Sequence, residues 1–105
     1  MMQRDLFEGV QRRFTVGIGQ FKPTKGQYRR NLERIGDLMR QSLQEGVDVL
    51  ALPETATTGY FVEGGVRELA IPATQLLHDL ACMYADLQPG RPLDICVGFY
   101  EYLDG

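Results

Sequence analysis

Residues 47–53 form a nearly continuous apolar run of strand length, Val47-Asp48-Val49-Leu50-Ala51-Leu52-Pro53. A run of this kind predicts a strand covered on both faces, and the proline marks its end. Upstream, residues 14–21 alternate β-forming and small residues and predict a buried strand, whereas residues 93–102 predict a third strand.

Two helices are expected between these strands. Residues 27–45 carry apolar side chains at three- and four-residue steps, with Gly46 as the C-terminal stop. Residues 71–86 predict a second helix with Pro72 in its first turn. Its inward stripe is expected to comprise Leu76, Leu77, Leu80, Ala81 and Tyr84. The resulting order, βαβαβ, calls for parallel strands and right-handed crossovers, so the predicted fold class is α/β.

The composition limits the classes of function. The chain has 105 residues, 44% of them hydrophobic, which suits one modest domain. A net charge of -3 without a basic cluster argues against nucleic acid as a partner. No apolar stretch suits a signal peptide or a membrane span. Cys82 and Cys96 form no CxxC pair and have no nearby histidine at ligand spacing, so we expect reduced thiols, a cytoplasmic location and no metal site.

Two parts are expected along the chain. Residues 1–13 are polar and aperiodic and are interpreted as an N-terminal leader, and residues 14–105 as a domain. Asp104-Gly105 is a typical hairpin-turn dipeptide at the very end of the chain, which predicts that the domain is truncated at its C-terminus.

The glycines after the first strand raise the question of a nucleotide site. Residues 17–22, Gly-Ile-Gly-Gln-Phe-Lys, place Lys22 where a GxGxxG fingerprint needs its third glycine, and the P-loop pattern fits at neither glycine. Close strand packing is therefore the preferred reason for Gly17 and Gly19.

Glu54 is the strongest candidate for chemistry. It follows the apolar strand directly, at the end of a parallel sheet where ligands bind. Partial burial there would raise the pKa of a carboxyl group towards the range useful to a general base. By position alone, a carboxylate that merely caps a solvated loop within residues 54–65 is equally acceptable.

The segment around Glu54 resembles a known family signature. Pro53-Glu54 followed by Thr58-Gly59-Tyr60 is similar to the PExxxTGY signature of nitrilases, amidases and related carbon-nitrogen hydrolases. Residues 20–23, Asn31 in the first helix, and residues 97–99 with Glu101 also fit this family in order and spacing.

The resemblance implies a Glu-Lys-Cys active site on an αββα, four-layer sandwich, of which this chain would be the N-terminal βαβαβ part. Glu54 would take the proton of a cysteine whose thiolate attacks an amide or nitrile carbon, and a lysine would stabilise the tetrahedral intermediate. Tyr60 and Phe61 either line the substrate pocket, the preferred interpretation, or fold the loop back on the sheet. The full-length protein is expected to be a homo-oligomer without a cofactor.

Only the glutamate of that active site is carried over to this sequence. Lys22 and Lys25 precede Glu54, whereas the lysine of the family follows its third strand. Cys82 and Cys96 are interpreted as buried packing thiols rather than nucleophiles. His78 is expected to be a solvated surface residue, and the 105-residue chain alone to be inactive.

The predicted activity is therefore hydrolysis of a non-peptide carbon-nitrogen bond in a small molecule, an amide rather than a nitrile. Two alternatives stay open. The chain is also compatible with the glutaminase domain of a glutamine-dependent NAD synthetase, whose opening segment is similar. The second alternative is a non-catalytic small α/β binding module, which gains weight only if the natural chain ends at Gly105.

Overall fold

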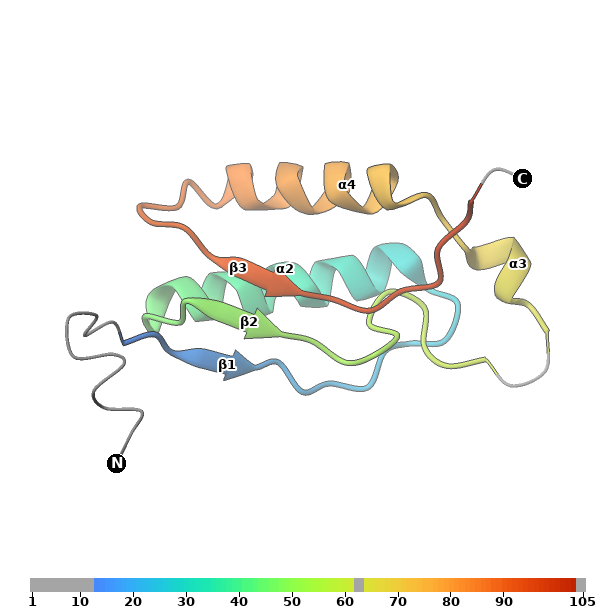
Figure 1. Cartoon of the computed structure of the whole chain (residues 1–105), viewed down its shortest axis with the longest axis horizontal. Coiled ribbons are helices and arrows are strands. Elements are labelled where there is room, and N and C mark those ends of the chain that lie inside the picture. The colour runs from blue at the N-terminus through green and yellow to red at the C-terminus, as the bar shows by residue number, and fades with distance from the viewer. Residues whose placement is uncertain (1–12, 62–63, 104–105) are drawn as a thin grey trace, which may run out of the picture.

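The computed structural model describes residues 13–61 and 64–103, and it shows three parallel strands with two long helices (Figure 1). Two predicted features lie outside the described residues. They are the leader of residues 1–13, except Arg13, and the Asp104-Gly105 turn. The elements are β1 (Val16–Ile18), α2 (Tyr28–Gln44), β2 (Val49–Ala51), α3 (Val66–Leu69), α4 (Ala73–Asp86) and β3 (Asp94–Cys96).

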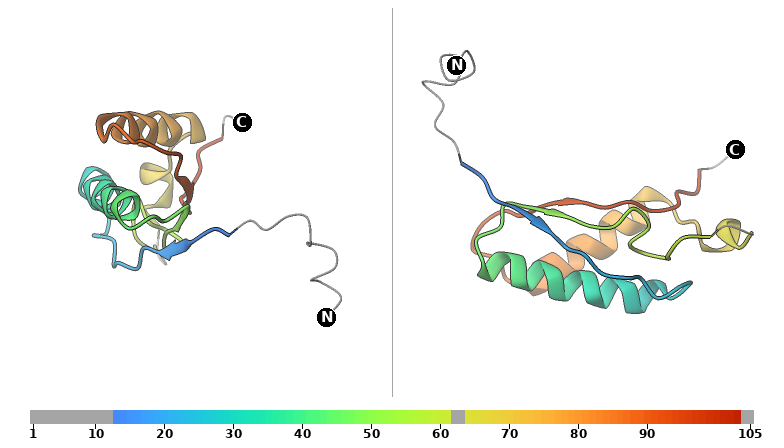
Figure 2. Two further views of the ribbon diagram at one scale, coloured as in Figure 1. Left: turned by 90° about the vertical axis from the view of Figure 1, so that its left-hand side faces the viewer. Right: turned by 90° about the horizontal axis from the view of Figure 1, so that it is seen from below.

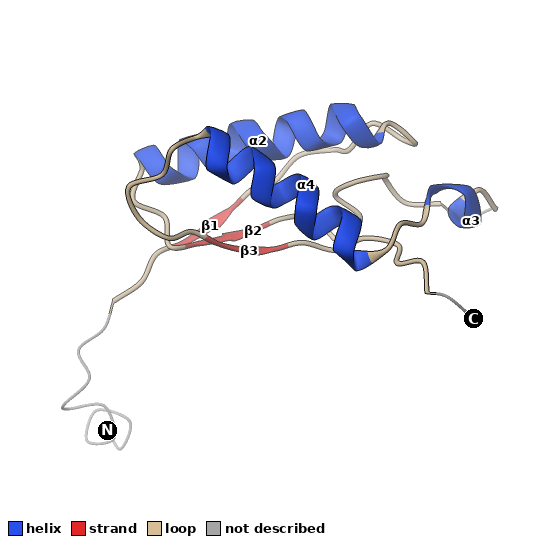
Figure 3. Cartoon of the chain, turned by 90° about the horizontal axis from the view of Figure 1, so that it is seen from above, coloured by secondary structure: helices blue, strands red, loops and turns tan. Residues whose placement is uncertain are grey.

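The sheet has the order β1-β2-β3, with both strand pairs parallel. The predicted α/β class and parallel pairing are thus confirmed. Both long helices lie on the same side of this sheet, as the end-on and top views show (Figures 2 and 3). The central strand β2 therefore has a helix-covered face and a face without a helix.

The core lies between the helices and the sheet. Leu50 at the centre of β2 is 2% exposed, and it pairs in register with Gly17 of β1 and Ile95 of β3. The helices contribute most of the remaining buried apolar side chains. The core comprises Leu32, Ile35, Met39, Val47, Leu50, Ala56, Leu76 and Leu93.

The glycines of the first strand are explained by this packing, as predicted. A Cβ atom on Gly17 would lie 3.0 Å from Cγ1 of Val47. On Gly19 it would lie 2.9 Å from Cδ2 of Leu52, closer than van der Waals contact allows. The absent side chains let the segment carrying β1 sit directly against its neighbours, so a phosphate-binding role is not needed to account for the glycines.

The opposite face of the sheet is open among the described residues. Val16 and Ile18 of β1 are 49% and 73% exposed, and Val49 and Ala51 of β2 are half-buried. The predictions that the first strand is buried and that β2 is covered on both faces are therefore wrong for this chain. The physical reason is that both helices pack on one side, so alternate side chains of each strand have no covering layer.

The strands are also shorter than predicted, at three residues each. Beyond Cys96, the chain bonds to loops instead of to a neighbouring strand. Ala56 N–H donates to the Gly98 carbonyl at 3.2 Å, and Ile71 forms an isolated parallel bridge with Glu101. Residues 97–103 therefore connect loops at the carboxyl end of the sheet rather than extending the ladder.

Helix α2 ends as the sequence predicts. Gly46 has a φ of 75°, and Val47 N–H donates to the Ser42 carbonyl at 2.9 Å, which is the long bond of a Schellman motif. Arg91 binds the same helix end from a distant loop, donating to the carbonyls of Ser42, Leu43 and Val47 at 3.0, 3.2 and 2.6 Å. One side chain thus joins the end of α2 to the entry of β2.

Helix α4 presents less of its predicted stripe to the core. Leu76 is buried and Leu80 and Tyr84 are half-buried, but Leu77 is 68% exposed and Ala81 is exposed as well. The stripe was predicted too wide because only one sheet edge and α2 lie beneath the helix. Outside the masked positions, no helix is both long and apolar enough to cross a membrane.

Candidate active site

Glu54 lies at the carboxyl end of the central strand β2, at the start of a segment that we call the Glu54 loop, residues 52–61 (Figure 1). The predicted position just after the carboxyl end of the strand is therefore confirmed. Glu54 is exposed, however, so the expected partial burial of its carboxylate is wrong. The chain turns inward only after Glu54, which leaves this carboxylate outside the buried part of the loop.

The buried part of the loop is the turn formed by residues 56–59. Thr57 and Thr58 are 1% and 2% exposed, and the N–H groups of Thr58 and Gly59 donate to the Thr55 carbonyl at 3.3 and 2.9 Å. Gly59 has a φ of 80°, and a Cβ there would lie 3.3 Å from the Cα of Lys25. Glycine is needed for both reasons, the left-handed backbone and the close approach.

The Glu54 loop lies between the segments that follow β1 and β3 (Figure 1). On the β1 side, Gly26 N–H donates to the Thr58 carbonyl at 2.8 Å. On the β3 side, Leu52 N–H donates to the Cys96 carbonyl at 2.9 Å. Hydrogen bonds from both neighbours therefore fix a loop that has no regular secondary structure of its own.

The two aromatic residues predicted for a substrate pocket have different environments. Tyr60 is 65% exposed. Phe61 is half-buried, packs edge-to-face on Tyr100 with ring centroids 6.5 Å apart, and donates its backbone N–H to the Tyr100 hydroxyl at 3.2 Å. The Lys25 ammonium lies 4.7 Å from the Phe61 ring centroid. Phe61 thus folds the loop back onto the molecule, while Tyr60 keeps an accessible ring.

The sequence missed the Lys25, Phe61 and Tyr100 cluster because its members are distant along the chain. It also missed the helix α3, which has four residues and therefore no measurable apolar period. Helix α3 lies beyond the end of the sheet where the Glu54 loop lies (Figure 1).

The cysteines are exposed, so their interpretation as buried packing thiols is wrong. Cys96 alternates with the inward Ile95 on β3 and faces the open side of the sheet. Cys82 lies on the outer side of α4, with its Sγ 3.6 Å from Nε2 of His78, so the expectation that no histidine lies near the cysteines is wrong. His78 is exposed, which confirms its prediction as a surface residue.

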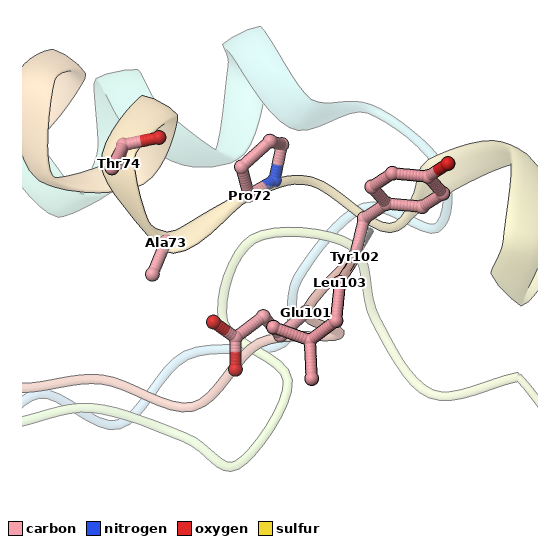
Figure 4. Close-up of a pocket in the computed structure, with 6 residues that line it drawn as sticks. All are labelled: Pro72, Ala73, Thr74, Glu101, Tyr102 and Leu103. Atoms are coloured by element: carbon pink, nitrogen blue, oxygen red, sulfur yellow. The ribbon is translucent and has the colours of Figure 1, made fainter. Parts of the chain in front are cut away.

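A shallow hollow lies beside the same end of the sheet, between the first turn of α4 and the segment from Glu101 to Leu103 (Figure 4). Its volume of about 260 Å³ is just below the usual size of ligand pockets. Within residues 13–61 and 64–103, no three His, Cys, Asp or Glu side chains are grouped so that they could hold a metal ion.

Comparison with protein families gives a match that includes the Glu54 loop. A family model described as carbon-nitrogen hydrolase matches residues 15–86, more than half of the chain. The chain belongs to the carbon-nitrogen hydrolase family. The match runs from β1 to the end of α4 and so includes Glu54 and the buried turn of its loop. A comparison with curated proteins gives no match.

Membership of the carbon-nitrogen hydrolase family gives the general class of activity, hydrolysis. Residues 87–105, which include β3 and Gly98, lie outside the matched range. The resemblance of the third strand to this family therefore stays a prediction from the sequence.

Proposed function

We propose that this chain supplies the general base for hydrolysis of a non-peptide carbon-nitrogen bond, in an amide rather than a nitrile, and that Glu54 is that base. The observation that carries the proposal is the position of Glu54. A family member presents an accessible carboxylate at the carboxyl end of its central strand, on a loop fixed by buried hydrogen bonds.

The proposed reaction follows from the resemblance to the nitrilase superfamily. Glu54 accepts the proton of a cysteine thiol, and the thiolate attacks the amide carbon to form a tetrahedral intermediate. The C–N bond then breaks as the nitrogen takes a proton and leaves as ammonia or an amine. Water hydrolyses the remaining thioester to a carboxylic acid and restores the thiol.

A nucleophilic cysteine and a lysine complete this mechanism, and we propose that both lie outside residues 1–105. The open face of the sheet supports this proposal, since Val16 and Ile18 lie where an αββα sandwich would place its second sheet. The exposed side of α4, with Leu77, is the proposed contact for a homo-oligomer.

The decisive experiment is Glu54→Gln in the protein expressed from its natural coding sequence. Ammonia release is measured with propionamide, glutamine and propionitrile as probes, so that amidase, glutaminase and nitrilase activity are separated. The substitution should lower turnover by about 10²-fold to 10⁴-fold because it removes the base but preserves shape. Glu68→Gln removes an exposed carboxylate from α3 and serves as the matched control. Unchanged turnover in Glu54→Gln would refute the assignment.

The exposed cysteines provide a second check. Because Cys82 and Cys96 are accessible, their exclusion as nucleophiles has to be tested chemically. We expect Cys82→Ala and Cys96→Ala to leave ammonia release unchanged, and residues 1–105 alone to release none. If ammonia release disappears with either substitution, the nucleophile lies in this chain and the proposed division of the active site is wrong.

A further inference from the structure

Asn31 of α2 is 0% exposed although its side chain is polar. Its Nδ2 donates to the Thr24 and Thr57 carbonyls, both at 2.9 Å, and its Oδ1 accepts from Thr24 N–H at 2.8 Å. Asparagine is a weak helix former, and a buried amide is unfavourable unless it is bonded, so α2 itself gains little from this residue. What the side chain does is tie the buried turn of the Glu54 loop to α2 and to the loop after β1.

Gly98 supports the same loop from the opposite side. A Cβ on Gly98 would lie 1.8 Å from the Glu54 carbonyl oxygen and 2.7 Å from its carbonyl carbon. These are backbone atoms, so no rotamer change could relieve the clash. The φ of Gly98 lies outside the left-handed region. Space, and not backbone conformation, is therefore the reason for glycine at this position.

The exposure of Glu54 makes these two contacts informative. A buried catalytic carboxylate is held by the side chains packed around it, whereas an exposed one takes its position mainly from its backbone. Displacing a reacting group by about 1 Å can lower a rate by about 10²-fold. The backbone of the Glu54 loop is held at Thr57 by Asn31, and at Glu54 itself by contact with Gly98.

We propose that Asn31 and Gly98 are positioning residues for Glu54. Asn31 anchors the buried turn that follows the carboxylate, and Gly98 provides the space in which the Glu54 peptide group rests against the segment after β3. This inference rests on the proposed role of Glu54 as general base. The anchoring itself can be measured independently of any activity.

The first measurement is amide hydrogen exchange on the 105-residue chain. Asn31→Asp keeps the size of the side chain but removes both donors, and Gly98→Ala adds one methyl group against the Glu54 carbonyl. Each variant should speed exchange at Ala56 and Gly26 by at least about tenfold while the interior amides of α2 change much less. A merely structural role would change protection evenly in both regions.

Matched controls are available for both variants. Ser42→Ala removes a buried polar side chain of α2 whose hydrogen bond, to the Leu38 carbonyl, stays within the helix. Gly90→Ala adds a methyl group where no heavy atom lies within 4 Å. Neither control should alter exchange in the Glu54 loop selectively. The inference would be overturned if Asn31→Asp and Gly98→Ala left the exchange rates unchanged, or raised them equally in the Glu54 loop and in α2. If Asn31→Asp fails to fold, the result for Gly98→Ala decides.

The second measurement is ammonia release by the natural protein with the same three probes. Gly98→Ala should lower kcat by about 10-fold to 100-fold. It should have little further effect in a Glu54→Gln background, because its effect acts through Glu54. Equal losses in both backgrounds, or an unchanged kcat, would overturn the positioning role. If Glu54→Gln alone has no effect, the proposed function fails, and hydrogen exchange still decides whether the loop is anchored.

Discussion

The two faces of the three-stranded sheet differ in what covers them. On the helix side, Ile35 of α2 is 0% exposed and Leu50 is 2% exposed. On the other side, Ile18 of β1 is 73% exposed. Residues of the same chemistry thus lie in a filled core on one face and in solvent on the other.

This difference shows where the stability of the chain originates. Burial of apolar surface is the main favourable contribution to folding, and here it comes almost entirely from one side of the sheet. The open face contributes little while it is uncovered, and it presents Val16 and Ile18 to any apolar surface that meets it. Matched substitutions on the two faces can therefore measure the asymmetry.

The largest expected effect is on the helix side. Ile35→Ala should lower the free energy of unfolding by about 2 to 5 kcal/mol, because it removes methyl groups from a filled core. Ile18→Ala in the same 105-residue chain should change it by less than about 0.5 kcal/mol, because its side chain is already in solvent. Urea unfolding monitored by circular dichroism measures both values.

If Ile35→Ala and Ile18→Ala lowered the free energy of unfolding equally, the two faces would not differ, because something would then cover the open face. Repeating the unfolding at several protein concentrations then identifies a second copy as the cover, because its contribution depends on concentration. In a longer protein whose other segments cover this face, Ile18→Ala should approach the cost of Ile35→Ala.

A smaller effect is expected at the edge of the helix layer. Arg91→Gln should lower the free energy of unfolding by about 1 to 3 kcal/mol, because carbonyls at the end of α2 lose a charged donor. Arg91→Lys should retain only part of the stability that Arg91→Gln loses, since an ammonium cannot span three carbonyls as a guanidinium does. Arg40→Gln breaks the exposed ion pair with Asp37 and serves as the control. If Arg91→Gln lowers the free energy of unfolding no more than Arg40→Gln does, the contact of Arg91 with the end of α2 contributes no stability.

The smallest effect has the opposite sign. Gly36→Ala should raise the free energy of unfolding by about 0.5 to 1 kcal/mol, because alanine is the better helix former and the nearest atom to its Cβ, Sδ of Met83, would be 3.6 Å away. Gly19→Ala should be destabilising, since its Cβ would lie 2.9 Å from Leu52. Thermal unfolding of both variants is the test, and a destabilising Gly36→Ala would mean that α2 and α4 pack more tightly than these distances indicate.

Local patterns in the sequence were sufficient for most elements of the fold. The apolar period of residues 27–45 predicted α2, and Gly46 predicted its end because a left-handed residue is the common helix terminator. The apolar run before Pro53 predicted β2, and with it the position of Glu54 at the carboxyl end of a strand. These predictions succeed because each depends on residues only a few positions apart.

The same patterns predicted the exposure of His78 but failed at two other positions. The thiol of Cys96 was expected to be buried because it lies in an apolar strand, but on β3 it faces the side of the sheet without helices. Glu54 was expected to be partly buried, but it is exposed, and only the turn after it is buried. A local pattern shows that alternate residues face opposite sides, but it does not show whether another layer covers each side.

The sequence by itself determined the α/β order of the elements, the end of the central strand before Pro53 and the presence of a carboxylate, Glu54, just after that strand. Only the tertiary structure decided which sheet face is filled and how the Glu54 loop is supported. The bond between Asn31 and Thr57 joins residues 26 positions apart. The contact of Gly98 with the Glu54 peptide group likewise forms only when β3 lies beside β2. Such contacts depend on chain crossovers and close packing, which no local spacing of residues encodes.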